Sequence, residues 1–173
     1  MKTEELRALQ APLKQRYREE PSAALITLHA EGRLGEGITC SVQTGRALVE
    51  AGLHQATGGD GLAVCSGDML LQALVACAGE TLSSVATALG IEVRSGSVRA
   101  SGDLDFRGTL SVDREAPVGF QHIALTFDLD TDADDEKLAT LLRLTERYCV
   151  VYQTLQHAPE AEVAIHRTSA AAQ

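Results

Sequence analysis

One apolar stretch constrains the fold of this chain more than any other: SGDMLLQALVACAGETLSSVATALG, from Ser66 to Gly90. Ser66 is a good N-cap, Asp68 places a carboxylate at the positive end of a helix, and Gly90 favours helix termination. Apolar residues occupy nearly every face between them, which is typical of a helix that is buried in a core or crosses a membrane. Asp68, Gln72 and Glu80 interrupt the run, so no continuous span is long enough for a membrane and we expect a core helix.

The composition indicates one acidic globular domain. The chain has 173 residues, 45% of them hydrophobic, and a net charge of -9, which argues against nucleic acid or an anionic membrane as a partner. The charged N-terminus lacks the apolar segment of a signal peptide, so we expect a cytoplasmic protein whose four cysteines are not a disulfide framework. We expect an N-terminal helical extension over residues 1–22, a single domain over 23–168 and a frayed tail over 169–173.

Before the core helix, alternating apolar and polar residues predict a β-hairpin. Residues 24–31 and 38–42 each have the period of a strand, and the glycine-rich GRLGEG between them, residues 32–37, predicts the turn. Cys40 falls on the apolar face of the second strand and is most simply a buried core residue. The stretch 44–65 has no regular period, so we expect an irregular loop there.

After the core helix, we expect two strands, a second helix and a last short strand. Residues 91–112 and 123–129 alternate apolar and polar side chains, as half-buried strands do. Apolar residues spaced by three and four from 138 to 155 predict one continuous helix with acidic residues in its first turn, and 161–167 predict the last strand. Short turns between neighbouring strands favour antiparallel sheets packed against helices, so we predict an α+β fold.

Two cysteines lie on apolar helical faces, Cys77 in the core helix and Cys149 in the second helix. Either one alone is most simply a core cysteine. Together they allow a second interpretation, in which one thiol is oxidised to a sulfenic acid and the other captures it as a disulfide.

The sequence around both cysteines resembles the OsmC/Ohr family. The core helix has the form S-x-D-x-L-L-x-A-L-x-A-C-A, Cys149 lies in ERYCV, and the strand segment VRASGDLDFRGTL lies between them. The resemblance spans about residues 23–167 and implies OsmC-like antiparallel sheets wrapped around two central helices, in an intertwined homodimer with active sites at the subunit interface. It also implies a thiol-dependent peroxidase that reduces organic hydroperoxides without a cofactor. Cys77 would attack the peroxide, Cys149 would resolve the sulfenic acid, and an external dithiol, small or carried by a lipoylated protein, would reduce the disulfide.

A reactive thiolate at Cys77 has an electrostatic requirement. Apolar surroundings raise the pKa of a thiol, and a carboxylate at Glu80, one turn further on, would raise it more, so a nearby arginine is expected. The N-terminal segment KQRYREEP offers Arg16 and Arg18, which we prefer to Arg147 because that residue points away from the second cysteine on a continuous helix. Glu80 and Glu146 are the candidates for holding the arginine. A solvated or structural carboxylate is the equal alternative for Glu80 and the preferred one for Glu146.

The sequence also departs from the family pattern, which leaves an alternative to the peroxidase. Family members commonly carry Glu ten residues before the attacking cysteine and Pro after the resolving one, where this chain has Gly67 and Val150. A non-enzymatic OsmC-like dimer that binds a small apolar molecule between its core helices is therefore the alternative to a peroxidase. A metal site is not favoured, because no C-x-x-C or H-E-x-x-H spacing occurs.

Overall fold

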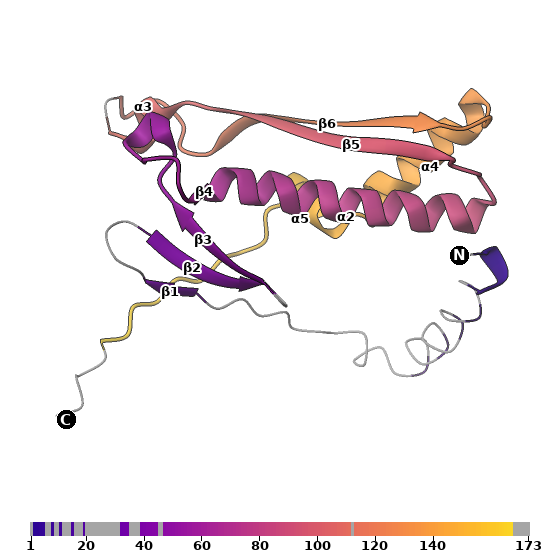
Figure 1. Cartoon of the computed structure of the whole chain (residues 1–173), viewed down its shortest axis with the longest axis horizontal. Helices are drawn as coiled ribbons and strands as arrows, with labels where there is room; N and C mark the ends of the chain where they lie inside the picture. The colour runs from indigo at the N-terminus through magenta and orange to yellow at the C-terminus, as the bar shows by residue number, and fades with distance from the viewer. Residues whose placement is uncertain are drawn as a thin grey trace.

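The computed structural model describes residues 2–5, 8, 11, 15, 19, 32–34, 39–44, 47–111 and 113–167 (Figure 1). Helices and strands in these ranges form the mixed architecture that the sequence predicts. In chain order they are β1 (Gly32–Leu34), β2 (Thr39–Thr44), β3 (Ala47–Gly52), the 3-10 helix η2 (Gln55–Thr57), β4 (Val64–Cys65), α2 (Ser66–Leu89), β5 (Ser95–Leu104), α3 (Phe106–Thr109), β6 (Phe120–Asp130), α4 (Asp135–Tyr148) and α5 (Val150–Gln156). The predicted α+β class is confirmed.

The predicted core helix is confirmed as α2, with one correction at its start. Gly90 ends the helix in the left-handed conformation, at φ 69°, where it donates its N–H to carbonyls of the last turn. The N-cap is Cys65 and not Ser66, because β4 runs directly into the helix and leaves Cys65 extended, at φ -68° and ψ 134°. Cys65 makes no side-chain capping bond, and Asp68 lies in the first turn as predicted.

Helix α2 lies along the β5–β6 hairpin, and α4 and α5 also pack against α2 (Figure 1). Its buried residues form two clusters: Leu82, Val85 and Ala86 pack with Leu141 of α4, and Leu74 and Ala78 pack with Cys149. By length and apolar composition alone α2 could cross a membrane, and the core helix of a globular domain meets the same criteria.

The β5–β6 hairpin has the alternation that the sequence predicts. The strands are antiparallel, with Val98 opposite Phe127 and Ala100 opposite Leu125, and these side chains are half-buried toward α2 and its neighbours. The first strand is shorter than the predicted 91–112, because Asp105 caps α3 directly after it by accepting the N–H of Arg107.

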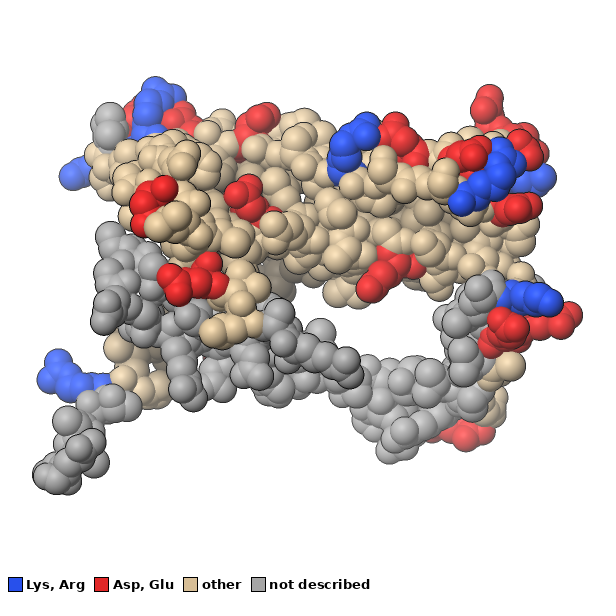
Figure 2. All heavy atoms as spheres, in the orientation of Figure 1, with Lys and Arg blue, Asp and Glu red and all other residues tan. Residues whose placement is uncertain are grey.

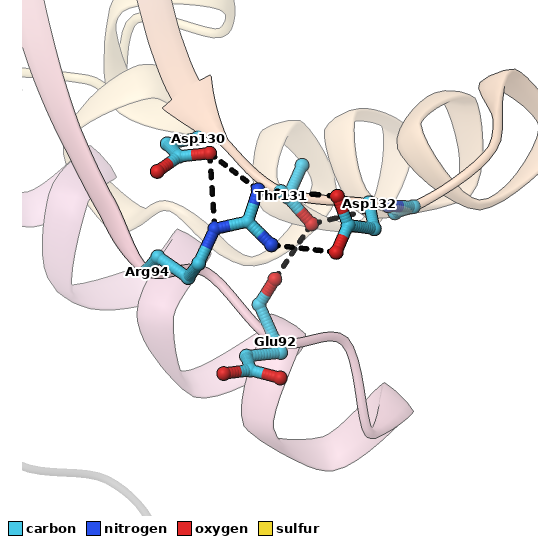
Figure 3. Close-up of polar contacts among 6 residues, drawn as sticks. Glu92, Arg94, Asp130, Thr131 and Asp132 are labelled. Carbon is cyan, nitrogen blue, oxygen red and sulfur yellow. Dashed lines mark hydrogen bonds and ion pairs between the residues drawn. The ribbon is translucent and has the colours of Figure 1, made fainter.

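Polar contacts tie the open end of this hairpin together (Figure 3). Arg94, just before β5, donates to Asp130 at the end of β6 and to Asp132 beyond it, at 2.5–2.6 Å. The hydroxyl of Thr131 donates to the carbonyl of Glu92 at 2.6 Å. These exposed contacts help to fix the register at which the two strands meet, and each adds little stability on its own.

The sheet before α2 differs most from prediction. Its strand order is β1-β2-β3-β4, with β1 and β3 antiparallel to β2, and a short parallel pairing between β3 and β4. Residues 32–34, expected in a turn, form β1, and residues 44–65, expected to be irregular, contain β3 and β4. The predicted strand at 24–31 and the environment of the Cys40 side chain lie outside the described residues.

The last part of the chain also departs from prediction. The expected continuous second helix is interrupted at Cys149, so that α4 and α5 are separate helices. The expected strand at 161–167 has no strand pairing with the described part of this chain, and Val163 and Ile165 there are more than nine-tenths exposed. Most of the predicted extension 1–22 and the tail 169–173 lie outside the described residues, so those boundaries stay predictions.

Candidate active site

The break between α4 and α5 determines the geometry of the site. Cys149 is both the last cap of α4 and the first cap of α5, with φ -72° and ψ 108°. Its N–H donates to the carbonyl of Thr145 and its carbonyl accepts the N–H of Gln153, both at 2.9 Å. The N–H groups of the first α5 residues have no acceptor within the helix, as at any helix start, and are therefore free to bind other atoms.

The structure brings the two predicted cysteines together. Cys77 lies in the middle of α2, half-buried, and Cys149 is 1% exposed in the cluster against which Cys77 packs. Both are free thiols, and each is a hydrogen-bonding neighbour of the other. The two thiols are therefore in contact, although the two residues are far apart in the sequence.

Backbone groups of α5 favour the thiolate of Cys77. Desolvation by burial on its own would raise the pKa of Cys77, but the N–H groups of Val151 and Val150, the Cys149 thiol and the Thr81 side chain lower it. The Thr81 hydroxyl itself donates to the backbone carbonyl of Cys77 at 2.7 Å. Together these neighbouring groups outweigh the burial and hold the pKa of Cys77 below its ordinary value, because polar groups next to a thiolate stabilise its charge.

The environment of Cys149 has the opposite effect. Burial raises the pKa of Cys149, and the nearby sulfur of Cys77 raises it further, against the lowering effect of the N–H groups of Tyr152 and Val151. The two pKa values are therefore pushed apart, with the anion on Cys77 and the proton on Cys149. A lowered pKa favours a reactive thiolate at Cys77. The attacking and resolving roles that the family resemblance implies for the pair stay predictions.

The residues predicted to activate Cys77 are less well defined. Arg16 and Arg18 lie outside the described residues, so their role stays a prediction. Glu80 is exposed and forms no ion pair with any residue that the structure describes, and its role as an arginine holder is likewise untested. The guanidinium of Arg147 lies 5.5 Å from the centre of the Tyr148 ring.

Sequence reasoning missed the backbone N–H groups of Val150 and Val151 as groups that lower the pKa of Cys77. The expected need for an arginine took only side chains into account, whereas the N–H groups of a helix start also stabilise a thiolate. The one available signal was position 150, where the family commonly has Pro, a residue that favours the first position of a helix. Val150 occupies that first position in α5.

A cavity of about 560 Å³ adjoins the cysteine pair. It lies between α2, β6, α4 and α5, and its buried inner wall includes Leu74, Ala78, Thr145 and Cys149. Its other lining residues are mainly apolar, with exposed polar side chains such as Gln121 and Glu146 among them. A cavity of this size and composition can hold a small, largely apolar molecule.

A second cavity has other lining residues. Cys65 and His54 line this cavity of about 310 Å³, and the His54 ring stacks on Phe106 with centroids 5.1 Å apart. Within the described ranges, no group of three or more His, Cys, Asp or Glu side chains could hold a metal ion.

Comparison with known proteins identifies the family. The family model described as OsmC-like protein matches residues 58–164, which is more than half of the chain and includes both cysteines. None of the curated proteins matches the sequence of this chain.

Solved structures with the same fold include an OsmC-like protein from Mycoplasma pneumoniae, at 15% identity and a TM-score of 0.64, over 77% of this chain and 89% of that one. Two organic hydroperoxide resistance proteins also match. The one from Legionella pneumophila has 18% identity and a TM-score of 0.61, over 78% of this chain and 92% of that one. The one from Elizabethkingia anophelis has 14% identity and a TM-score of 0.62, over 78% of this chain and 91% of that one. The chain therefore belongs to the family of OsmC-like proteins, as the sequence around its two cysteines predicts.

Proposed function

We propose that this protein is a thiol-dependent peroxidase that reduces organic hydroperoxides through Cys77 and Cys149. The observation that carries the proposal is the contact between the two thiols, with the pKa of Cys77 lowered and that of Cys149 raised. Family membership and the names of the hydroperoxide resistance proteins among its structural neighbours support the same class of substrate.

The proposed reaction has two steps. The Cys77 thiolate attacks the outer oxygen of the hydroperoxide, the O–O bond breaks, and the alkoxide leaves and takes a proton from water to become an alcohol. Cys149 then attacks the sulfur of the resulting sulfenic acid, the S–S bond forms, and hydroxide leaves with the thiol proton as water. An external dithiol, small or carried by a lipoylated protein, returns the pair to the reduced state, and no cofactor takes part.

The proposal includes a homodimer in the cytoplasm, where thiols are kept reduced. Helix α2 bears only two charged residues, Asp68 and Glu80, and Figure 2 shows few charged side chains along the region where it lies. Leu70 and Leu89 of the same helix are 38% and 42% exposed, and contact with a partner subunit would reduce the exposure of these apolar side chains. Light scattering of the purified protein tests this part of the proposal: a monomer mass at micromolar concentration contradicts it.

Single cysteine variants test the activity. Cys77→Ser abolishes turnover of an organic hydroperoxide with a dithiol reductant, because the attacking atom is gone. Cys149→Ser allows one oxidation and then leaves Cys77 to overoxidise, since no second thiol captures the sulfenic acid. Cys65→Ser is the matched control and keeps turnover, and multiple turnover by Cys77→Ser contradicts the proposal.

A second candidate is a binding protein for a small apolar molecule, and the specific observation in its favour is the apolar cavity beside Cys149. The two functions make different predictions for the cysteine variants. If the cavity serves binding alone, hydroperoxide leaves all the thiols unreacted and Cys77→Ser behaves as the unmodified protein does.

A further inference from the structure

Helix α5 lacks the groups that usually stabilise the start of a helix. It has seven residues, its N-cap Cys149 makes no side-chain capping bond, and its first turn contains no acidic residue. Helix α4, by contrast, begins with the capping side chain of Asp134 and has two acidic residues in its first turn. An isolated helix of this length is unstable in water, so contacts with the rest of the protein must hold α5 in place.

The packing contacts of α5 are limited. None of its residues is fully buried, and Val151, Tyr152 and Leu155 are partly buried against one cluster of the core. That cluster contains Cys149, so α5 helps to cover this thiol. Residues 157–167, which follow α5, form no helix or strand, and the large apolar side chains among them are more than nine-tenths exposed. The described chain that follows α5 therefore adds little to the stability of the helix.

The sulfur of Cys77 supplies what the start of α5 lacks. The N–H groups of Val150 and Val151, the first two residues of α5, hydrogen-bond this sulfur across the contact between α5 and α2. Because these N–H groups favour the thiolate, the thiolate must equally favour the helix start that presents them, since the coupling between two groups is reciprocal. A negative charge at this position also interacts favourably with the dipole of the helix.

We infer that the Cys77 thiolate caps α5 from α2, and that oxidation of the cysteine pair removes this cap and loosens α5. In the disulfide, the sulfur of Cys77 is bonded to that of Cys149 and carries no charge, and a neutral sulfur is a weak acceptor. The bond still ties Cys149 to α2, so α5 unwinds beyond this residue and does not leave the protein. Cys149, which is 1% exposed in the reduced protein, then loses the cover of α5 only after the disulfide has formed. The inference rests on the proposed function for its natural oxidant, a hydroperoxide.

Hydrogen–deuterium exchange of the full chain, measured at one mildly alkaline pH, tests the inference. The disulfide is made with diamide, which takes two electrons and two protons from the two thiols, so that its formation does not depend on peroxide chemistry. The amides of Gln153 and His157 each donate to a carbonyl one turn earlier at 2.9 Å and therefore report on α5. Losing one hydrogen bond to a charged group changes an equilibrium about tenfold or more, so these amides are expected to exchange about tenfold faster in the disulfide form. Exchange in α4 is expected to stay within about twofold. Equal exchange of α5 in the two forms overturns the inference.

Two matched variants separate the loss of charge from the new covalent bond. Cys77→Ser has a neutral side chain of similar size and forms no disulfide, and its α5 is expected to exchange about as fast as in the oxidised protein. Cys149→Ala keeps the thiolate of Cys77 and cannot form the pair, so its α5 should stay as protected as in the reduced protein. Alanine is used at position 149 because serine could itself cap α5. Slow exchange of α5 in Cys77→Ser, or equally fast exchange in both variants, overturns the inference.

The outcomes separate this inference from the proposed function. If diamide yields no Cys77–Cys149 disulfide, both fail. If the disulfide forms and α5 exchanges as it does in the reduced protein, only the inference fails. If α5 loosens in the disulfide made with diamide but hydroperoxide does not oxidise Cys77, the proposed function fails and the cap on α5 stands.

Discussion

Replacing Val150 with proline tests whether backbone N–H groups stabilise the Cys77 thiolate. Val150 is the first residue of α5, 68% exposed, and its N–H is one of two backbone donors to the sulfur of Cys77. Proline is accepted at the first position of a helix, and Cys149, with φ -72° and ψ 108°, already has the extended conformation that a residue before proline adopts. The substitution therefore removes a hydrogen-bond donor with little change to the fold.

The expected magnitude follows from the energy of one hydrogen bond to a charged group, about 1.5–3 kcal/mol. We use the lower value, because the N–H of Val151 and the Cys149 thiol remain and Cys77 is only half-buried. Since about 1.4 kcal/mol is tenfold in an equilibrium, the proline variant should hold roughly a tenth of the thiolate at a pH below the pKa of Cys77.

The rate of alkylation of Cys77 by iodoacetamide, followed by mass spectrometry across a pH series, measures the thiolate directly. Val150→Ala is the control because it removes the same side chain and keeps the N–H. A thermal melt checks folding, and the proline variant should melt no lower than the alanine variant, because proline reduces the entropy of the unfolded chain. If the two variants alkylate with the same pH dependence, the backbone N–H of Val150 does not stabilise the thiolate.

Other side chains give separate, testable effects. Leu141 is 1% exposed, so Leu141→Ala should lower the free energy of unfolding, measured in urea, by about 3 kcal/mol. Leu142 is 45% exposed, so Leu142→Ala should lower it by less than about 1 kcal/mol. Equal losses for the two variants contradict the described core. Asp134→Ala should lower the melting temperature at neutral pH, because Asp134 caps α4 and the N–H of Lys137 lowers its pKa. That stabilisation is present above the unfolded pKa and is lost as the pH falls through the folded one, so a difference that persists in strong acid contradicts this origin. The rate of hydroperoxide reduction should rise with pH and level off below the pKa of a free thiol, about 8.5, and a rate still rising there contradicts a lowered pKa at Cys77.

Much of the fold could be predicted because the responsible signals are local. Helix α2 has an apolar composition, an acidic first turn and a terminating glycine, and the β5–β6 hairpin alternates residue by residue. Strand β3 was missed because Ala47–Gly52 is short, ends in glycine and has no clear alternation. Its strand character comes from pairing along its whole length with β2, which only the assembled sheet supplies.

The candidate site was predicted in part. Cys77 and Cys149 could be paired from their helical faces and from the family resemblance, and the structure places them in contact. The break at Cys149 could not be predicted, because apolar residues continue at helical spacing through Tyr152 and Leu155 and no glycine or proline marks it. Because the break was not predicted, the backbone N–H groups at the start of α5 that lower the pKa of each thiol were not predicted either.

The proposed activity requires that Cys77 and Cys149 act as one redox pair. The most direct measurement is to add one equivalent of an organic hydroperoxide to the fully reduced protein and map its cysteines by mass spectrometry without reduction. We expect rapid formation of a Cys77–Cys149 disulfide while Cys40 and Cys65 stay reduced. Four unreacted thiols, or a disulfide that contains Cys65 in place of either partner, would contradict it.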